Sequence, residues 1–173
     1  MKMAEDFELP LISFIDTPGA YPGIESEERG MSEAIAKNLS LLSNLKTPII
    51  VIITGEGGSG GALAIGIGDH VCMLEHSIYA VASPEACASI VWRDGSKAKD
   101  AAEAMKVDAS NLKNLGLVDE VIEEPLGGAH RDIRGVSNSI SQVIEKKLLT
   151  FDEVDISDLM NKRYEKIMSY GSI

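Results

Sequence analysis

The segment that most constrains how this chain can fold is a glycine-rich stretch at residues 55–61, Gly-Glu-Gly-Gly-Ser-Gly-Gly. It follows an apolar, β-branched run at residues 49–54 and precedes a run of small residues at 62–67. These flanks predict a strand buried on both faces, then a turn, then a helix. Because glycine loses much conformational entropy on ordering, its concentration here indicates that another group approaches the backbone closely. At a helix N-terminus, the free N–H groups would face an anionic or oxyanionic ligand.

A second turn, rich in Pro and Gly, spans residues 16–23 and leaves the end of an apolar run at 9–15. Apolar residues at helical spacing over 31–45 connect this run to the strand predicted at 49–54. Strand, helix and strand make a right-handed βαβ unit with parallel strands, so both turns leave the same edge of the sheet. We therefore expect their N–H groups to form a two-sided oxyanion hole. The expected donors lie near Gly19, Ala20, Gly60 and Gly61.

The rest of the chain predicts more short strands and helices of one α/β domain. Ser83 and Pro84 are typical of a helix start, as cap and first residue. We expect a core over residues 1–131 and a helical C-terminal appendage of the same domain over 132–173. Extended segments are predicted at 71–74, 77–81 and 117–122, a turn at 124–131, and helices at 84–92, 97–105, 109–115, 132–149 and 157–169.

Composition limits the possible functions. The chain has 173 residues, of which 45% are hydrophobic and 25% charged, enough for a real hydrophobic core. Its formal net charge of -11 argues against nucleic-acid binding, because phosphate backbones are held by clustered Lys and Arg. No apolar run is long enough for a membrane span, and residues 1–6 do not resemble a signal peptide.

Most other polar residues have structural explanations. Cys72 and Cys87 are the only cysteines and lack metal-site spacing, so we interpret them as buried free thiols of a reducing compartment. We interpret His70 and His76 as surface or capping residues. The segment containing Lys162, Arg163 and Lys166 is expected to be an exposed helix face, and Glu56 an exposed or loop-ordering carboxylate.

Two further chemistries could use a glycine-rich turn. A phosphate-binding P-loop requires Gly-Lys-Ser/Thr at its end, and the chain has Ala62 and Leu63 there instead, which excludes it. A nucleophile elbow, G-x-S-x-G, does match, with Ser59 as nucleophile and Asp119 and His130 following in hydrolase order. The turn contains more glycines than an elbow needs, which favours a backbone donor site with Ser59 as a spacer or helix cap.

Several motifs, taken together and in order, resemble those of the carboxyltransferase alpha subunits of bacterial and plastid acetyl-CoA carboxylases. Beyond the two turns, the resemblance rests on Glu-Glu-Arg-Gly at 27–30, Ser-Pro-Glu at 83–85, Pro-Leu-Gly-Gly-Ala-His-Arg at 125–131 and Met-Ser-Tyr-Gly at 168–171. It covers essentially the whole chain. It implies a crotonase-like fold of β-β-α units, and transfer of a carboxyl group from carboxybiotin to acetyl-CoA, giving malonyl-CoA for fatty acid biosynthesis.

The resemblance also implies roles for residues. Backbone donors at Gly60 and Gly61, with help from Gly19 and Ala20, would hold the ureido oxyanion of biotin. Gly57, Gly58, Ser59 and Tyr21 would contact the cofactor. A partner beta subunit would supply the facing thioester site and carry the enzyme's zinc, so no metal is expected in this chain.

The implied assembly contains the beta subunit, a biotin carboxyl carrier protein and biotin carboxylase, with an α2β2 arrangement of the transferase, in bacterial cytoplasm or plastid stroma. Family members carry a long region ahead of the first strand predicted here, so the chain resembles a truncated subunit. We expect exposed apolar edges and poor solubility without a partner. The alternatives are a serine hydrolase, a crotonase-type acyl-CoA hydratase and a non-catalytic interaction module.

Overall fold

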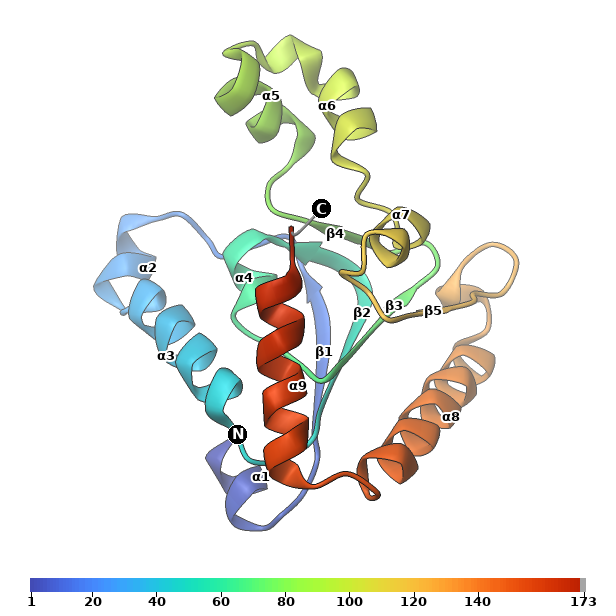
Figure 1. Ribbon diagram of the computed structural model, residues 1–173. Coiled ribbons are helices and arrows are strands. Elements are labelled where there is room, and N and C mark those ends of the chain that lie inside the picture. The colour runs from blue at the N-terminus through green and yellow to red at the C-terminus, as the bar shows by residue number, and fades with distance from the viewer. Residues whose placement is uncertain (172–173) are drawn as a thin grey trace.

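A parallel β-sheet forms the centre of the computed structural model, which describes residues 1–171 (Figure 1). The strand order is β1-β2-β3-β5, and β4 pairs with β2 beyond the end of β3. All these pairings are parallel, which confirms the predicted α/β class and βαβ unit. The strands are β1 (Leu11–Thr17), β2 (Ile49–Gly58), β3 (His70–Leu74), β4 (Ile78–Ala80) and β5 (Glu120–Ile122).

Strand β2 is longer than the sequence predicts, because it continues into the glycine-rich stretch. Gly57 has ladder partners on both sides, Thr17 of β1 and Tyr79 of β4. The helix α4 (Ser59–Leu63) then begins at Ser59, not at residue 62. The prediction of a turn over residues 55–61 is therefore wrong, because the first four of these residues belong to the strand and the last three to the helix. Pairing with β1 and β4 at Gly57, and with β4 at Gly58, holds these two glycines extended despite their low strand propensity.

Helices cover both faces of the sheet. One core layer lies between the sheet and α3, α4 and α7, and contains Ile15, Leu42, Val51, Met73 and Leu112. The opposite layer, with Ile50, Ile52, Cys72 and Leu74, is covered by α8. Besides α4, the α-helices are α1 (Lys2–Asp6), α2 (Ile24–Glu28), α3 (Met31–Asn44), α5 (Pro84–Trp92), α6 (Ala98–Met105), α7 (Ala109–Asn114), α8 (Ile133–Phe151) and α9 (Ile156–Ser169).

The helices α5 and α6 project from the body as a hairpin (Figure 1). Ser83 caps α5 through a hydrogen bond from the Ala86 N–H, with Pro84 at the first position, as predicted. Short 3-10 turns lie at Gly95–Lys97 and Ala129–Arg131. Within residues 1–171, we find no helix with the length and apolar character needed to cross a bilayer.

Two of the predictions for polar residues are wrong. His70 is buried on β3, where its Nε2 lies 3.1 Å from Oε2 of Glu120, and burial lowers the pKa of its imidazole. Arg163 is 1% exposed and forms a two-pronged ion pair with the buried carboxylate of Asp69. Both partners lie far away in the sequence, so neither pairing leaves a local signal. His76 is exposed, as expected, and of the two free cysteines Cys72 is buried while Cys87 is only partly buried.

Candidate active site

The two segments for which the sequence predicts turns, residues 16–23 and 55–61, lie in direct contact, backbone against backbone. A Cβ atom added to Gly58 would lie 2.1 Å from the carbonyl oxygen of Pro18, and one added to Gly61 would lie 2.7 Å from the carbonyl carbon of Gly19. Real Cβ atoms do not approach so closely, so only glycine fits at either position. The close approach inferred from the glycines is therefore, first of all, the approach of one turn to the other.

Gly60 is different, because the packing around it does not require a glycine at this position. An added Cβ would meet Ile35 Cδ1 at 3.5 Å and Ala20 Cβ at 3.8 Å, which are ordinary contacts. Its N–H and that of Gly61 lie in the first turn of α4, where no helical acceptor exists. Outside the bonds internal to helices and strands, no hydrogen bond found for residues 1–171 uses these two donors or the N–H of Ala20. The N–H of Gly19, in contrast, donates to Oγ1 of Thr17 at 3.3 Å.

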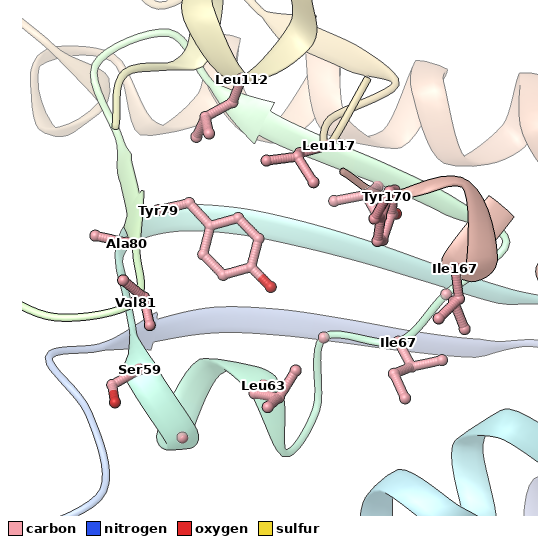
Figure 2. Close-up of a pocket in the computed structure, with 14 residues that line it drawn as sticks. Ser59, Leu63, Ile67, Tyr79, Ala80, Val81, Leu112, Leu117, Ile167 and Tyr170 are labelled. Atoms are coloured by element: carbon pink, nitrogen blue, oxygen red, sulfur yellow. The ribbon is translucent and has the colours of Figure 1, made fainter. Parts of the chain in front are cut away.

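An apolar hollow of about 500 Å³ begins beside this junction (Figure 2). Ser59 and Gly60 line it at the end of β2, and Figure 2 shows the Tyr79 ring extending across it from β4. The other residues labelled in Figure 2 line the hollow from α4, β4, α7 and α9 and from the segments that follow these elements. These residues are Leu63, Ile67, Ala80, Val81, Leu112, Leu117, Ile167 and Tyr170.

Two tyrosines, Tyr79 and Tyr170, line the hollow. Burial raises the pKa of Tyr79 above its ordinary value. Burial also raises the pKa of Tyr170, to about 12, and the negative charges of Asp119 and of an ionised Tyr79 add to this effect. Both phenols are therefore neutral at physiological pH and can donate hydrogen bonds inside an otherwise apolar space.

The other predicted site residues do not all lie at the apolar hollow. Ser59 is exposed and has a positive φ of 46°, a conformation that L-residues rarely adopt, at the strand-to-helix turn that an elbow requires. His130 lines a separate hollow, with Thr54, His76 and Glu124, so the structure does not bring it to Ser59. Tyr21 is 72% exposed and lies over Gly23, outside the apolar hollow.

Sequence reasoning missed the contribution of α9 to this hollow. Ile167 and Tyr170 form part of its wall, and Arg163 fixes the same helix to the core through Asp69. Leu159, Arg163, Ile167 and Tyr170 recur at helical spacing, a pattern that indicates one face turned inward. The charge of Arg163 concealed this pattern, because the guanidinium was interpreted as a sign of exposure.

The chain is similar in sequence to known proteins. Over 171 residues the chain is 57% identical to the acetyl-coenzyme A carboxylase carboxyl transferase subunit alpha of Vibrio cholerae. The match covers 99% of this chain and 54% of that relative, so the chain spans about half the length of the relatives it matches.

Solved structures show the same fold at low sequence identity. A Pseudomonas malonate decarboxylase hetero-tetramer in complex with coenzyme A aligns with a TM-score of 0.68 at 17% identity, over 94% of this chain and 66% of that one. Transcarboxylase 12S with methylmalonyl-coenzyme A and methylmalonic acid bound aligns with a TM-score of 0.64 at 23% sequence identity. This alignment covers 80% of this chain and 28% of that one. The predicted crotonase-like fold is confirmed. A family model described as acetyl co-enzyme A carboxylase carboxyltransferase-like matches residues 1–171, and the chain belongs to that family.

Proposed function

We propose that this chain provides the carboxyl-transfer part of an acetyl-CoA carboxylase alpha subunit, acting with a carboxylated biotin carrier and acetyl-CoA to give malonyl-CoA. The observation that carries the proposal is the backbone contact between residues 16–23 and 55–61, which gathers the N–H groups of Gly60, Gly61 and Ala20 at one place, where Gly60 also lines an apolar hollow. Family membership and the Vibrio cholerae relative support the same activity.

The backbone donors would act on negative oxygen. Carboxyl transfer leaves transient negative charge on an oxygen of the donor and on the enolate oxygen of the acceptor, and fixed N–H groups stabilise such charge without reorganising. Gly60, Gly61 and Ala20 are the donors we assign to the ligand, whereas the Gly19 N–H donates to Thr17 Oγ1 and its backbone packs against Gly61. Biotin, when bound, supplies the carboxyl group.

The surroundings of these donors suit that role. The hollow is lined mainly by hydrocarbon, which excludes water and strengthens hydrogen bonds to a charged oxygen. Ser59 would flank the bound group without attacking it. The proposal gives no cofactor contact to Gly57, whose backbone is flanked by ladder partners, or to Tyr21, which lies outside the hollow.

The proposed partners follow from the same activity. A beta subunit would complete the thioester site, and a biotin carboxyl carrier protein and biotin carboxylase would supply the activated carboxyl group, in an α2β2 transferase of bacterial cytoplasm or plastid stroma. The similar malonate decarboxylase is a hetero-tetramer, which is in keeping with a shared site.

Reverse carboxyl transfer tests the proposal. The chain is mixed with the beta subunit, free biotin and malonyl-CoA, and release of acetyl-CoA is followed. Ala20→Pro removes one N–H, and the preceding Gly19 has no Cβ to clash with a proline ring. We expect the rate to fall by about 10²–10³-fold, the usual cost of losing one oxyanion donor.

The matched variant Ala20→Ser keeps the N–H and should lose far less activity, with both variants giving the circular dichroism spectrum of the parent. Product release that does not depend on this chain, or equal losses in the two variants, would overturn the proposal. Labelling of Ser59 by a fluorophosphonate would instead favour the hydrolase alternative, for which His130 lines the wrong hollow.

A further inference from the structure

A second group of reactive side chains lies on the opposite face of the sheet from the apolar hollow. His70 and Cys72 belong to β3 and Glu120 belongs to β5. One donor atom of each residue, a ring nitrogen, the thiol sulfur and a carboxylate oxygen, lies within 4.8 Å of those of the other two. The proposed carboxyl transfer uses none of these three residues.

The backbone fixes this arrangement. His70 and Cys72 are two residues apart on one strand, so their side chains point to the same face. Cys72 is the register partner of Glu120 in the β3–β5 ladder, which places the sulfur and the carboxylate side by side. Three donors held by two paired strands need little rearrangement to close on a small ion, so the ordering cost of binding is low.

The group is enclosed, yet it can be reached from one side. Cys72 packs in the layer beneath α8, among apolar residues that include Ile144 and Leu148. The His70 side chain is 8% exposed. β5 lies at one of the two edges of the sheet, and the Glu120 side chain on it remains 29% exposed. An ion would enter along Glu120.

The imidazole is oriented as a metal-binding histidine usually is. Its Nε2 faces Glu120 at 3.1 Å, and its Nδ1 faces Oδ2 of Asp119 at 3.7 Å. That carboxylate is itself held by the Val71 N–H, at 2.6 Å, and by the ammonium group of Lys166. A ligating histidine typically directs its other nitrogen to a carboxylate in this way, which fixes the ring and its tautomer.

We propose that Nε2 of His70, Sγ of Cys72 and a carboxylate oxygen of Glu120 form a three-ligand site for a divalent transition metal of the zinc type, with Asp119 positioning the imidazole. A mixed nitrogen, sulfur and oxygen donor set is one that zinc accepts, and three protein ligands leave the fourth tetrahedral position open. On binding, the metal takes the place of the thiol proton, which leaves to the buffer, and displaces the His70–Glu120 hydrogen bond.

The surrounding charges are compatible with a cation. The Cys72 thiolate and the carboxylates of Asp119 and Glu120 would be the anionic groups around it, and Lys147 of α8 and Lys166 of α9 are the nearby cationic ones. Burial raises the pKa of the Cys72 thiol to about 12, so in the absence of metal the thiol carries its proton. Metal binding would neutralise the charge that thiol ionisation creates.

Titration with Co(II) tests this site in the full chain, after metal has been stripped with a chelator and the chelator removed. A thiolate ligand gives Co(II) an intense charge-transfer absorption in the near ultraviolet, and tetrahedral geometry gives strong visible bands. We expect both in the parent chain. Cys72→Ala should abolish the charge-transfer band, whereas Cys87→Ala, at the other cysteine, should leave the spectrum and the affinity unchanged.

Two further variants test the proposed ligand geometry without creating a cavity in the core. Glu120→Gln keeps the size of a partly exposed side chain and should weaken Co(II) binding by at least about tenfold, and Asp119→Asn should weaken it by about 10–100-fold. His76→Asn, at an exposed histidine, is the matched control. Failure of the parent chain to bind Co(II), or a spectrum that survives Cys72→Ala or is lost in Cys87→Ala, would overturn the proposal. No readout here involves carboxyl transfer.

Discussion

At the scale of single residues, the glycines of the candidate site divide into two kinds. A methyl group at Gly61 would lie 2.7 Å from the carbonyl carbon of Gly19, whereas one at Gly60 would meet only ordinary contacts. Gly61→Ala should therefore lower the free energy of unfolding by about 1–3 kcal/mol, the usual cost of overpacking. Gly60→Ala should change it by no more than about 0.5 kcal/mol. Urea denaturation measures both, and equal effects would contradict this division.

The amino-acid sequence alone predicted part of the candidate site. Glycine at 58 and 61 correctly indicated a close approach, but the sequence could not say that the approaching group is the chain's own backbone at residues 18–20. His70 was misjudged because it was placed beside a short strand rather than at its first residue, and Arg163 because its charge was taken to mean exposure. Their partners lie 50 and 94 residues away, so only the folded chain reveals them.

At the scale of elements, one buried ion pair attaches α9 to the rest of the molecule. The Arg163 guanidinium donates to both carboxylate oxygens of Asp69 and to the carbonyl oxygens of Leu42, Leu45 and Thr47. Two of these carbonyls lie at the C-terminal end of α3, where the only backbone bond to them that we find among residues 1–171 is a long one of 3.4 Å from the Leu45 N–H to the Leu42 oxygen. A single side chain thus joins α9, α3 and the loop before β3.

Arg163→Met should cost about 3–5 kcal/mol of unfolding free energy, because it leaves the Asp69 carboxylate buried without its cation. Urea unfolding followed by circular dichroism measures the loss. Lys162→Met is the matched control: Lys162 is exposed on the same helix, and its replacement should have little effect. Adding Asp69→Asn to Arg163→Met should recover part of the loss, since it removes the unpaired charge. If the two single variants were equally stable, α9 would not depend on this pair.

The elements themselves were more predictable than their ends. Ten of the strands and helices stand close to where periodicity and caps place them, among them α3, α5 and α9, because each has a local apolar pattern or a capping residue. The junction of β2 and α4 was placed wrongly. There β4 pairs with Glu56–Gly58, and that ladder overrides the tendency of glycine to end a strand.

At the scale of the whole molecule, the sheet leaves β1 at its edge. On its outer side β1 pairs with no strand within the described residues, and Phe14 on it is 53% exposed. The topology follows from the βαβ rule, which sequence alone can apply, but which strand lies at the edge depends on how distant segments pair. A long edge with exposed apolar side chains is a template for further strand pairing.

This edge should make the chain self-associate. Sedimentation velocity over increasing protein concentration should show a rising mean sedimentation coefficient, and Phe14→Lys should reduce the rise, because a charge on an edge strand opposes pairing with another chain. The substitution should leave the unfolding free energy nearly unchanged, since the ring is already about half exposed. Tyr164→Lys, at a residue of α9 that is 66% exposed and far from the edge in sequence, is the control for the added charge. If the two variants reduced association equally, net charge rather than the edge of β1 would govern it.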